Sequence, residues 1–71
     1  MQVETVMIHV RFAPDGTVTE IAERPDGVTA QAWFNLLSLK ATGQYQIFAG
    51  GRGLFRLPRT QIEDLKAGAT A

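Results

Sequence analysis

Three arginines and an aromatic side chain are the residues of this sequence with the clearest chemistry. Arg52, Arg56 and Arg59 lie within a stretch of eight residues, Phe48 lies just before them, and Lys40 precedes all four. Guanidinium groups neutralise phosphates, and an exposed aromatic ring can stack on a base. These five residues are therefore candidate nucleic-acid contacts. The alternative interpretation is that the arginines keep a surface hairpin in solution and discourage edge pairing.

The net charge of the whole chain argues against a dedicated nucleic-acid binder. Seven basic and seven acidic residues give a net charge of zero, whereas such proteins are usually basic. The charges are nevertheless unevenly distributed, because residues 1–26 carry five acids and two arginines, and residues 27–62 carry four cations and no acid. The basic segment can face an acidic partner or pair with the acidic segment of its own chain.

Gly50, Gly51 and Gly53 surround Arg52 in a segment that could cradle a phosphate or form a turn. A dinucleotide-binding fingerprint needs a further glycine where this chain has Arg56, and it opens a helix, whereas the alternating residues here predict a strand. The Gly-Lys-Ser/Thr ending of a P-loop is absent from the sequence. We therefore predict that the glycines form a hairpin turn.

His9 is the only histidine, and the chain has no cysteine. A single imidazole cannot hold a structural metal ion, so we expect no metal site. As a general base His9 needs an acid that orients it, and Glu23 is the candidate in the expected strand pairing. A chain of 71 residues also has little room for a pocket. We expect a protein that is not an enzyme, with no catalytic residue and no cofactor.

The elements that position these residues begin with Val3–Phe12, whose alternation of apolar and polar residues predicts a strand with one buried face. Pro14-Asp15-Gly16 then predicts a turn closed by a glycine bulge, and Thr17–Glu23 is the returning strand. In this register the opposed pairs are Phe12 with Val18, Val10 with Glu20, His9 with Ile21 and Ile8 with Ala22.

A second Pro-Asp-Gly, at residues 25–27, leads into a predicted helix from Ala30 to about Ala41. Thr29 is a suitable N-cap, and Gly43 is expected to end the helix in the left-handed conformation. The apolar residues spread over more than half of the helix circumference, which is wider than one sheet face needs; they are Trp33, Phe34, Leu36, Leu37 and Leu39. Either the sheet and the last helix cover them all, or some form a protein interface, for which the candidates are Trp33, Phe34, Leu36 and Leu39.

The segment Tyr45–Leu57 predicts a second hairpin around the glycines. A loop of Gly51-Arg52-Gly53, with Gly53 in the bulge position, matches the apolar faces; it sets Ala49 opposite Phe55 and Ile47 opposite Leu57. A two-residue loop would set Ile47 opposite Arg56 instead. In the preferred register the other face carries Gln46, Phe48 and Arg56, and Leu54 lies beside the loop.

Pro58 ends this hairpin, and Thr60 with Glu63 three residues later forms a capping box, which predicts a short helix to about Ala67 with Gly68 as its stop. The element order is then ββαββα. We expect a single α+β domain over residues 1–71, with two antiparallel β-hairpins, a central amphipathic helix and a short C-terminal helix in two layers. The four-stranded sheet forms either within one subunit or across a dimer.

These observations favour a small non-enzymatic binding module of accessory, regulatory or inhibitory type that acts through protein–protein contacts. We expect a homodimer that binds an unidentified protein, because a small domain gains burial by self-association. The alternative is a small nucleic-acid-binding protein that uses the second hairpin. No apolar run can span a bilayer, and the lack of cysteine fits a reducing cytoplasm, so we expect a cytoplasmic protein without a membrane partner. Such chains are common among bacterial and phage accessory proteins, an analogy of type that identifies no partner.

Overall fold

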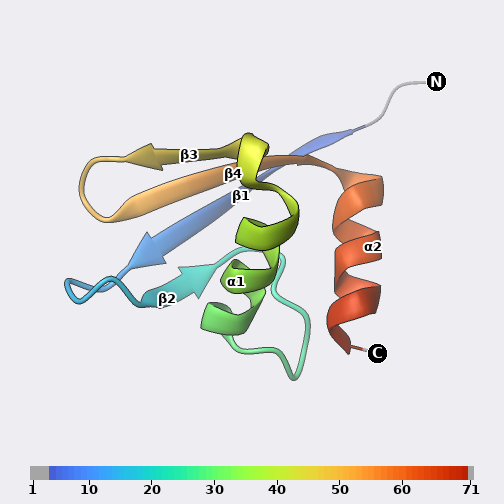
Figure 1. The fold of residues 1–71 in the computed structure, drawn as a ribbon, viewed down its shortest axis with the longest axis horizontal. Coiled ribbons are helices and arrows are strands. Elements are labelled where there is room, and N and C mark those ends of the chain that lie inside the picture. Colours follow the sequence, from blue (N-terminus) through green and yellow to red (C-terminus); the bar gives the residue numbers. More distant parts are fainter. Residues whose placement is uncertain (1–3, 71) are drawn as a thin grey trace.

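The computed structural model describes residues 4–70 as four strands, two α-helices and one short 3-10 helix (Figure 1). In chain order the elements are β1 (Thr5–Phe12), β2 (Val18–Ile21), α1 (Ala30–Lys40), η1 (Thr42–Gln44), β3 (Tyr45–Phe48), β4 (Arg52–Pro58) and α2 (Arg59–Thr70). The predicted α+β class and the order ββαββα are confirmed. The predicted start of the first strand, at Val3, lies outside the described residues.

The four strands form one antiparallel sheet in the order β2-β1-β4-β3. The two hairpins join through β1 and β4, whose register runs from Thr5 opposite Pro58 to Arg11 opposite Arg52. Figure 1 shows these two strands side by side in the middle of the sheet, with β2 and β3 at its edges. The sheet is therefore complete within one chain, and no second subunit has to supply strands.

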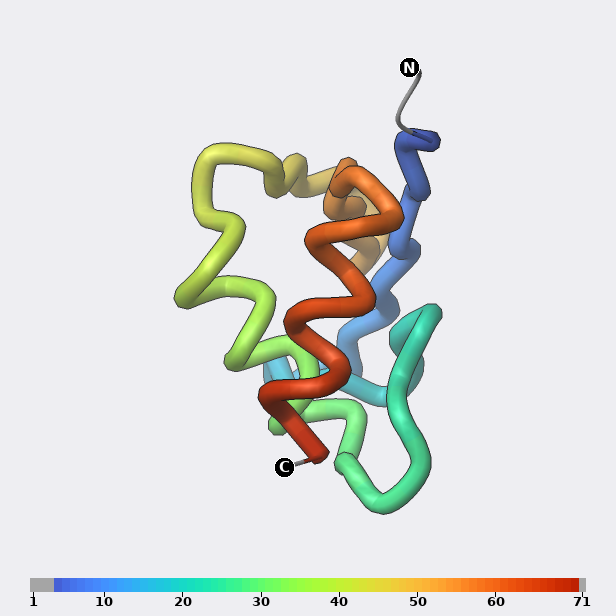
Figure 2. Tube along the Cα trace, turned by 90° about the vertical axis from the view of Figure 1, so that its right-hand side faces the viewer, coloured from blue at the N-terminus to red at the C-terminus, as the bar shows by residue number. Residues whose placement is uncertain are grey.

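The core contains side chains from one face of the sheet and from both helices. Ile8 of β1 and Phe55 and Leu57 of β4 point into it and are fully buried. Ile62 of α2 and Leu37 of α1 complete the same cluster. In the view of Figure 2 the two helices lie next to each other, with β1 to one side of them. Alternate residues of β1 and β4 thus point toward the helices, and the others point away.

Trp33 anchors α1 in this core. Its side chain is fully buried, and its Nε1–H donates a hydrogen bond to the carbonyl oxygen of Ala22, at 3.1 Å. Next to it, four aromatic rings with centroids 4.6–5.8 Å apart join α1 to three strands; they belong to Phe12, Phe34, Tyr45 and Phe55. Three of these contacts are edge-to-face and the Tyr45–Phe55 pair is tilted, and aromatic contacts of this kind add about 0.5–1.5 kcal/mol per pair beyond burial. The wide apolar surface of α1 is used largely inside the protein.

The first hairpin contains the predicted turn, with Gly16 at φ +90°, but not the predicted register. The observed pairs are Phe12 with Val18, Arg11 with Glu20 and Val10 with Ile21. The pairs expected beyond Phe12 are therefore wrong. A bulge that includes Thr19 shifts the register, and without it the carboxylate of Glu20 would face the core side of β1.

The second hairpin turns earlier than expected. Gly50 and Gly51 take positive φ angles of +82° and +71° in the loop, whereas Gly53 lies within β4 and is not in the left-handed region. The observed pairs are Tyr45 with Phe55, Gln46 with Leu54, Ile47 with Gly53 and Phe48 with Arg52. The expected loop of residues 51–53 and the pairs built on it are wrong, because the two adjacent glycines provide the turn and the earlier register stacks Tyr45 on Phe55. The shift is even-numbered, so each side chain keeps its predicted face.

The start of α1 is confirmed, because the Thr29 hydroxyl accepts a hydrogen bond from the Ala32 N–H at 3.1 Å. Its expected exit through a left-handed Gly43 is wrong. The helix ends at Lys40, and Gly43 lies inside η1 without a positive φ. The tighter 3-10 turn lets the chain reverse toward β3 with no left-handed residue.

The last helix begins earlier and ends later than predicted. It follows β4 directly at Arg59, whose N–H donates to the Glu4 carbonyl oxygen at 2.8 Å, so Thr60 is not its N-cap. Gly68 lies inside the helix instead of ending it, and Ala69 beyond it packs against the core. Tertiary packing of this last turn outweighs the weak helix propensity of one glycine. Within residues 4–70, no helix has both the length and the apolar character needed to cross a membrane.

Glu23 ties the loop between β2 and α1 to α2. Its Oε1 accepts hydrogen bonds from Arg59 Nη1 and Lys66 Nζ, both at 2.7 Å. These two cations lower the pKa of Glu23 from its usual 4.5 to about 2. Arg59 also lies within 4 Å of Glu4 and Glu63. Because Glu23 has a φ of +65°, which is unfavourable for a side chain with a Cβ, the ion pairs hold a loop conformation that the backbone alone disfavours.

Candidate functional site

One face of the sheet points away from the helices, and it carries the chemistry of the strands. Side chains alternate along each strand, so the register assigns every second residue to this face. We call it the open face; it consists of Thr5, Met7, His9, Arg11, Glu20, Gln46, Phe48, Arg52, Leu54, Arg56 and Pro58. The four members on β1 are all exposed.

One row of the open face crosses all four strands. Glu20 on β2 lies opposite Arg11 on β1, and Arg11 lies opposite Arg52 on β4. Arg52 in turn lies opposite Phe48 on β3. Neighbouring strands are about 4.8 Å apart, so the backbone positions of the row span only about 15 Å. The row places two guanidinium groups between a carboxylate and an aromatic ring.

The arginines of the open face have no ionic partner in the part of the chain that the structure describes. All ion pairs found within residues 4–70 involve Arg59 or Lys66, and none involves Arg11, Arg52 or Arg56. Like charges directly opposite each other destabilise a sheet. The open face therefore carries three guanidinium groups against the single carboxylate of Glu20, and this excess of positive charge makes it a surface suited to an anion.

Apolar side chains lie among these arginines, and we call three of them, Met7, Phe48 and Leu54, the apolar floor of the open face. Leu54 is only 3% exposed although it points away from the core, and it is not part of the core cluster, so other residues of the open face cover it. Phe48 and Met7 on the same face expose 38% and 56% of their surface. A planar ring can rest on such carbon atoms while its charged substituents reach the guanidinium groups.

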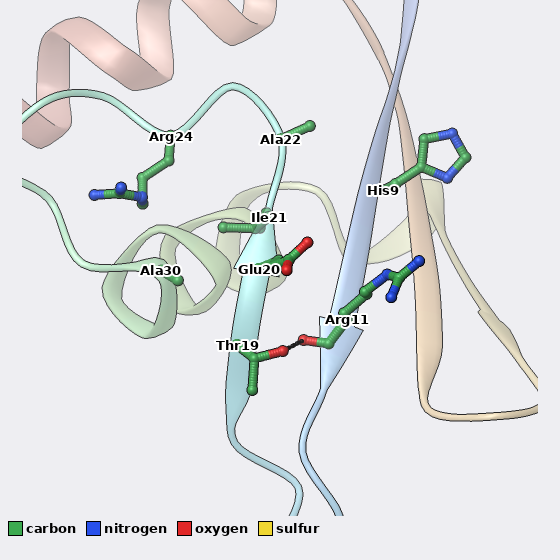
Figure 3. A pocket seen from close by; sticks show the side chains of 8 residues that line it. All are labelled: His9, Arg11, Thr19, Glu20, Ile21, Ala22, Arg24 and Ala30. Carbon is green, nitrogen blue, oxygen red and sulfur yellow. Dashed lines mark hydrogen bonds between the residues drawn. The ribbon is translucent and has the colours of Figure 1, made fainter.

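A depression of about 400 Å³ lies at this end of the open face, and its lining residues are His9, Val10, Arg11, Phe48, Arg52 and Gly53. A second depression, of about 420 Å³, shares His9 and Arg11 and extends over the edge of β2 (Figure 3). Figure 3 shows His9 and Arg11 extending from β1 in the direction of β4, whereas Arg24 extends away from both strands. Because the side chains around the second depression do not converge, we take the first, which Phe48 and Arg52 line, as the candidate site.

The structure divides the five predicted nucleic-acid contacts into two groups. Phe48, Arg52 and Arg56 share the open face. Lys40 is the last residue of α1, and Arg59 begins α2, where acidic residues bind its guanidinium group. Proximity in sequence grouped all five, but only the three strand residues come together on one surface.

The predicted protein interface on α1 is mostly covered. Trp33 is fully buried, and Phe34 and Leu36 are half-buried and packed against the core. Leu39 is the exposed member of the four, at 73%. The fold therefore covers Trp33 internally. The surface of α1 that a partner could contact is centred on Leu39.

Sequence reasoning missed Arg11 and His9 as neighbours of Arg52. The alternation of the first strand already places both of them on its outward side. The sequence gives no indication that β1 pairs with β4, a contact between residues more than 40 positions apart. That pairing brings Arg11 directly beside Arg52 and His9 beside Leu54.

The acid predicted to orient His9 is engaged elsewhere, because Glu23 accepts hydrogen bonds from Arg59 and Lys66. Within residues 4–70, no hydrogen bond or ion pair joins the His9 side chain to a carboxylate. The same residues hold no group of three or more metal-ligating side chains. The open face is distinguished by its positive charge and its apolar floor. Both are properties of a binding site.

Comparison with known proteins found no matching family model, no matching curated protein and no matching solved structure.

Proposed function

We propose that this protein is a non-enzymatic binding module that holds a single-stranded nucleic acid on its open face. The observation that carries the proposal is the row in which Arg11 and Arg52 lie next to Phe48. Guanidinium groups bind phosphate oxygens, and an adjacent aromatic ring stacks on a base, which are contacts that every nucleotide offers. Arg56 extends the basic track along β4, about 13 Å beyond Arg52.

A single strand fits this surface better than a duplex. In a duplex the two faces of each base are covered by its neighbours, so Phe48 can stack only on a base that is unpaired and turned outward. Duplex readers commonly insert a helix or a protruding ribbon into a groove. On the open face the candidate contacts lie instead on the central strands and on β3, which is the kind of surface on which sheet proteins bind splayed bases.

The open face supports this function better than α1 supports a protein partner. A protein interface depends on a few large anchors that can enter a partner, and Trp33, the largest side chain of α1, is buried in the core. Leu39 alone is a small anchor. Nucleic-acid binding and a chain without cysteine also fit a reducing cytoplasm, the compartment that we propose.

The proposal is tested by titrating labelled single-stranded DNA and RNA, and the matching duplexes, with the protein at low salt. We expect single strands to bind more tightly than duplexes. Phe48→Leu keeps the apolar volume but removes the stacking ring, and it should weaken single-strand binding about 5- to 100-fold. Leu39→Ala, an exposed change on α1, is the control that should leave binding unchanged.

Two results would overturn the proposal. The first is an absence of binding at about tens of micromolar protein at low salt, because a basic surface that binds nucleic acid has at least that non-specific affinity. The second is equal binding by wild type and Phe48→Leu together with a preference for duplexes, because the stacking contact would then have no role.

A further inference from the structure

The two edges of the sheet are protected to different degrees. At the edge formed by β2, the Val18 N–H donates to the side-chain oxygen of Gln31, at 2.9 Å. The register shift at Thr19 distorts the same strand, and Glu20 adds a charge to it. Bulges, charges and covering side chains are the devices that keep an edge strand from pairing with another chain. The β2 edge is therefore closed to strand addition.

The β3 edge carries none of these devices. Its four residues, Tyr45 to Phe48, are uncharged and unbulged. Among the described residues, no side chain hydrogen-bonds to their backbone. Ile47 in the middle of the strand is 74% exposed, and its side chain lies on the core side of the sheet, beyond the cover of the helices. An uncharged, apolar and unprotected edge is a template for another strand.

We propose that a second copy of this chain occupies the β3 edge, with the two β3 strands pairing antiparallel about a two-fold axis. The pairing sets Ile47 opposite Ile47 of the second copy, and Phe48 opposite Gln46 of the second copy. It joins two four-stranded sheets into one eight-stranded sheet. Each Ile47 then covers the other, which removes the largest apolar exposure found on the strands.

Two features of the molecule make a second copy the occupant. The first is charge, because β3 carries none and meets its own copy without like-charge repulsion. The second is closure. A sheet with two free edges would add copies at both of them and grow into a fibre. Here the β2 edge is capped by Gln31, so pairing stops at two copies. The contact is only four residues long, so we expect a weak and reversible dimer.

Dimer formation has a consequence for the proposed nucleic-acid site, and this step alone rests on the proposed function. A two-fold axis perpendicular to the sheet keeps both open faces on the same side. Phe48 of each copy then lies near the axis, with Arg52 and Arg11 on its outer flank. A dimer would therefore offer one continuous surface to a strand that is too long for one copy.

The test is sedimentation of the full chain from about 1 µM to about 1 mM, compared between two lysine variants. Ile47→Lys places a charge on the β3 edge. Leu39→Lys places the same charge on α1, at a residue of nearly equal exposure, 74% against 73%. We expect wild type and Leu39→Lys to dimerise alike, and Ile47→Lys to raise the dissociation constant at least tenfold. Thermal denaturation verifies that both variants fold.

A monomer over the whole range would overturn the dimer, and dimerisation lost in Leu39→Lys but kept in Ile47→Lys would move the interface to α1. The dimer and the nucleic-acid site fail independently. The side chain of residue 47 lies on the opposite side of the sheet from the open face, so monomeric Ile47→Lys should still bind a short oligonucleotide. Only the tighter binding of long oligonucleotides, which requires the dimer, should disappear in this variant.

Discussion

Arg11 and Arg52 lie directly opposite each other on the two central strands of the sheet. Like charges in this arrangement destabilise a sheet, whereas an oppositely charged or apolar pair would contribute about 0.2–1 kcal/mol in its favour. Glu20 lies opposite Arg11 on its other side, but within residues 4–70 no carboxylate oxygen comes within 4 Å of either guanidinium group. A local cost of this kind is typical of positions that serve a ligand, because an anion between the two groups converts the repulsion into binding.

Replacing Arg52, which faces Arg11 on one side and Phe48 on the other, with glutamine should therefore stabilise the fold and weaken binding at the same time. Removal of the like-charge contact should raise the free energy of unfolding by up to about 1 kcal/mol. Loss of one phosphate contact should reduce the slope of log affinity against log salt by about one. Urea denaturation measures the first effect, and oligonucleotide titrations at several salt concentrations measure the second.

Lys40→Gln is the matched control for this prediction, because it removes one positive charge from the exposed end of α1. It should leave both the stability and the salt slope close to those of wild type. A salt slope that falls equally in Arg52→Gln and Lys40→Gln would mean that the protein responds to its overall charge and not to the open face.

Acid should release the loop that Glu23 holds. Its pKa in the folded protein is about 2, against 4.5 ordinarily, so its ion pairs stabilise the fold fully above pH 4.5, and this contribution falls as the pH drops toward 2. We expect Glu23→Gln to cost about 1–2 kcal/mol at neutral pH, less than the pKa shift alone implies because solvent partly screens Arg59. The cost should vanish near pH 2 in denaturation curves. Glu20→Gln, which removes an exposed carboxylate outside these ion pairs, is the control variant.

Truncation of Trp33 should lower the stability of the fold much more than truncation of Leu39. Trp33→Phe leaves a cavity and removes the donor to the Ala22 carbonyl, so we expect a loss of about 1–3 kcal/mol of stability. Leu39→Ala at a 73% exposed position should stay within about 0.5 kcal/mol. Chemical denaturation followed by circular dichroism measures both. A stable Trp33→Phe would contradict the buried position of the indole.

Local patterns in the sequence were sufficient to predict the helices and strands of this fold and their order. Alternation from Val6 to Phe12, the turn at Gly16 and the N-cap at Thr29 each depend on a few neighbouring residues, and each is confirmed. Helix ends were less predictable. Gly68 has the intrinsic character of a stop, but packing of Ala69 against the core keeps the helix intact beyond it.

Registers and long-range pairs could not be predicted from the same patterns. The bulge at Thr19 and the loop at Gly50 are set by which residues reach the core, and that depends on the complete sheet. The candidate site depends on the pairing of β1 with β4, which no local pattern encodes. Parity alone assigned Phe48 and Arg56 to the correct face. It also placed Arg11 on the outward side of its strand, but no local pattern showed that Arg11 lies beside Arg52.

Gly53 should tolerate no side chain, although it is not a turn residue. A Cβ at Gly53 would meet the Tyr45 hydroxyl and come within 2.8 Å of the ring carbon Cε1, so Gly53→Ala must displace a ring that packs on Phe34 and Phe55. We expect a loss of about 1–3 kcal/mol by overpacking, measured by urea denaturation. Gly43→Ala is the control, because Gly43 has no atom near its Cβ position and no positive φ. The cost of Gly53→Ala should shrink in a Tyr45→Leu background, and an undiminished cost there would show that the backbone of β4, and not the Tyr45 ring, requires glycine.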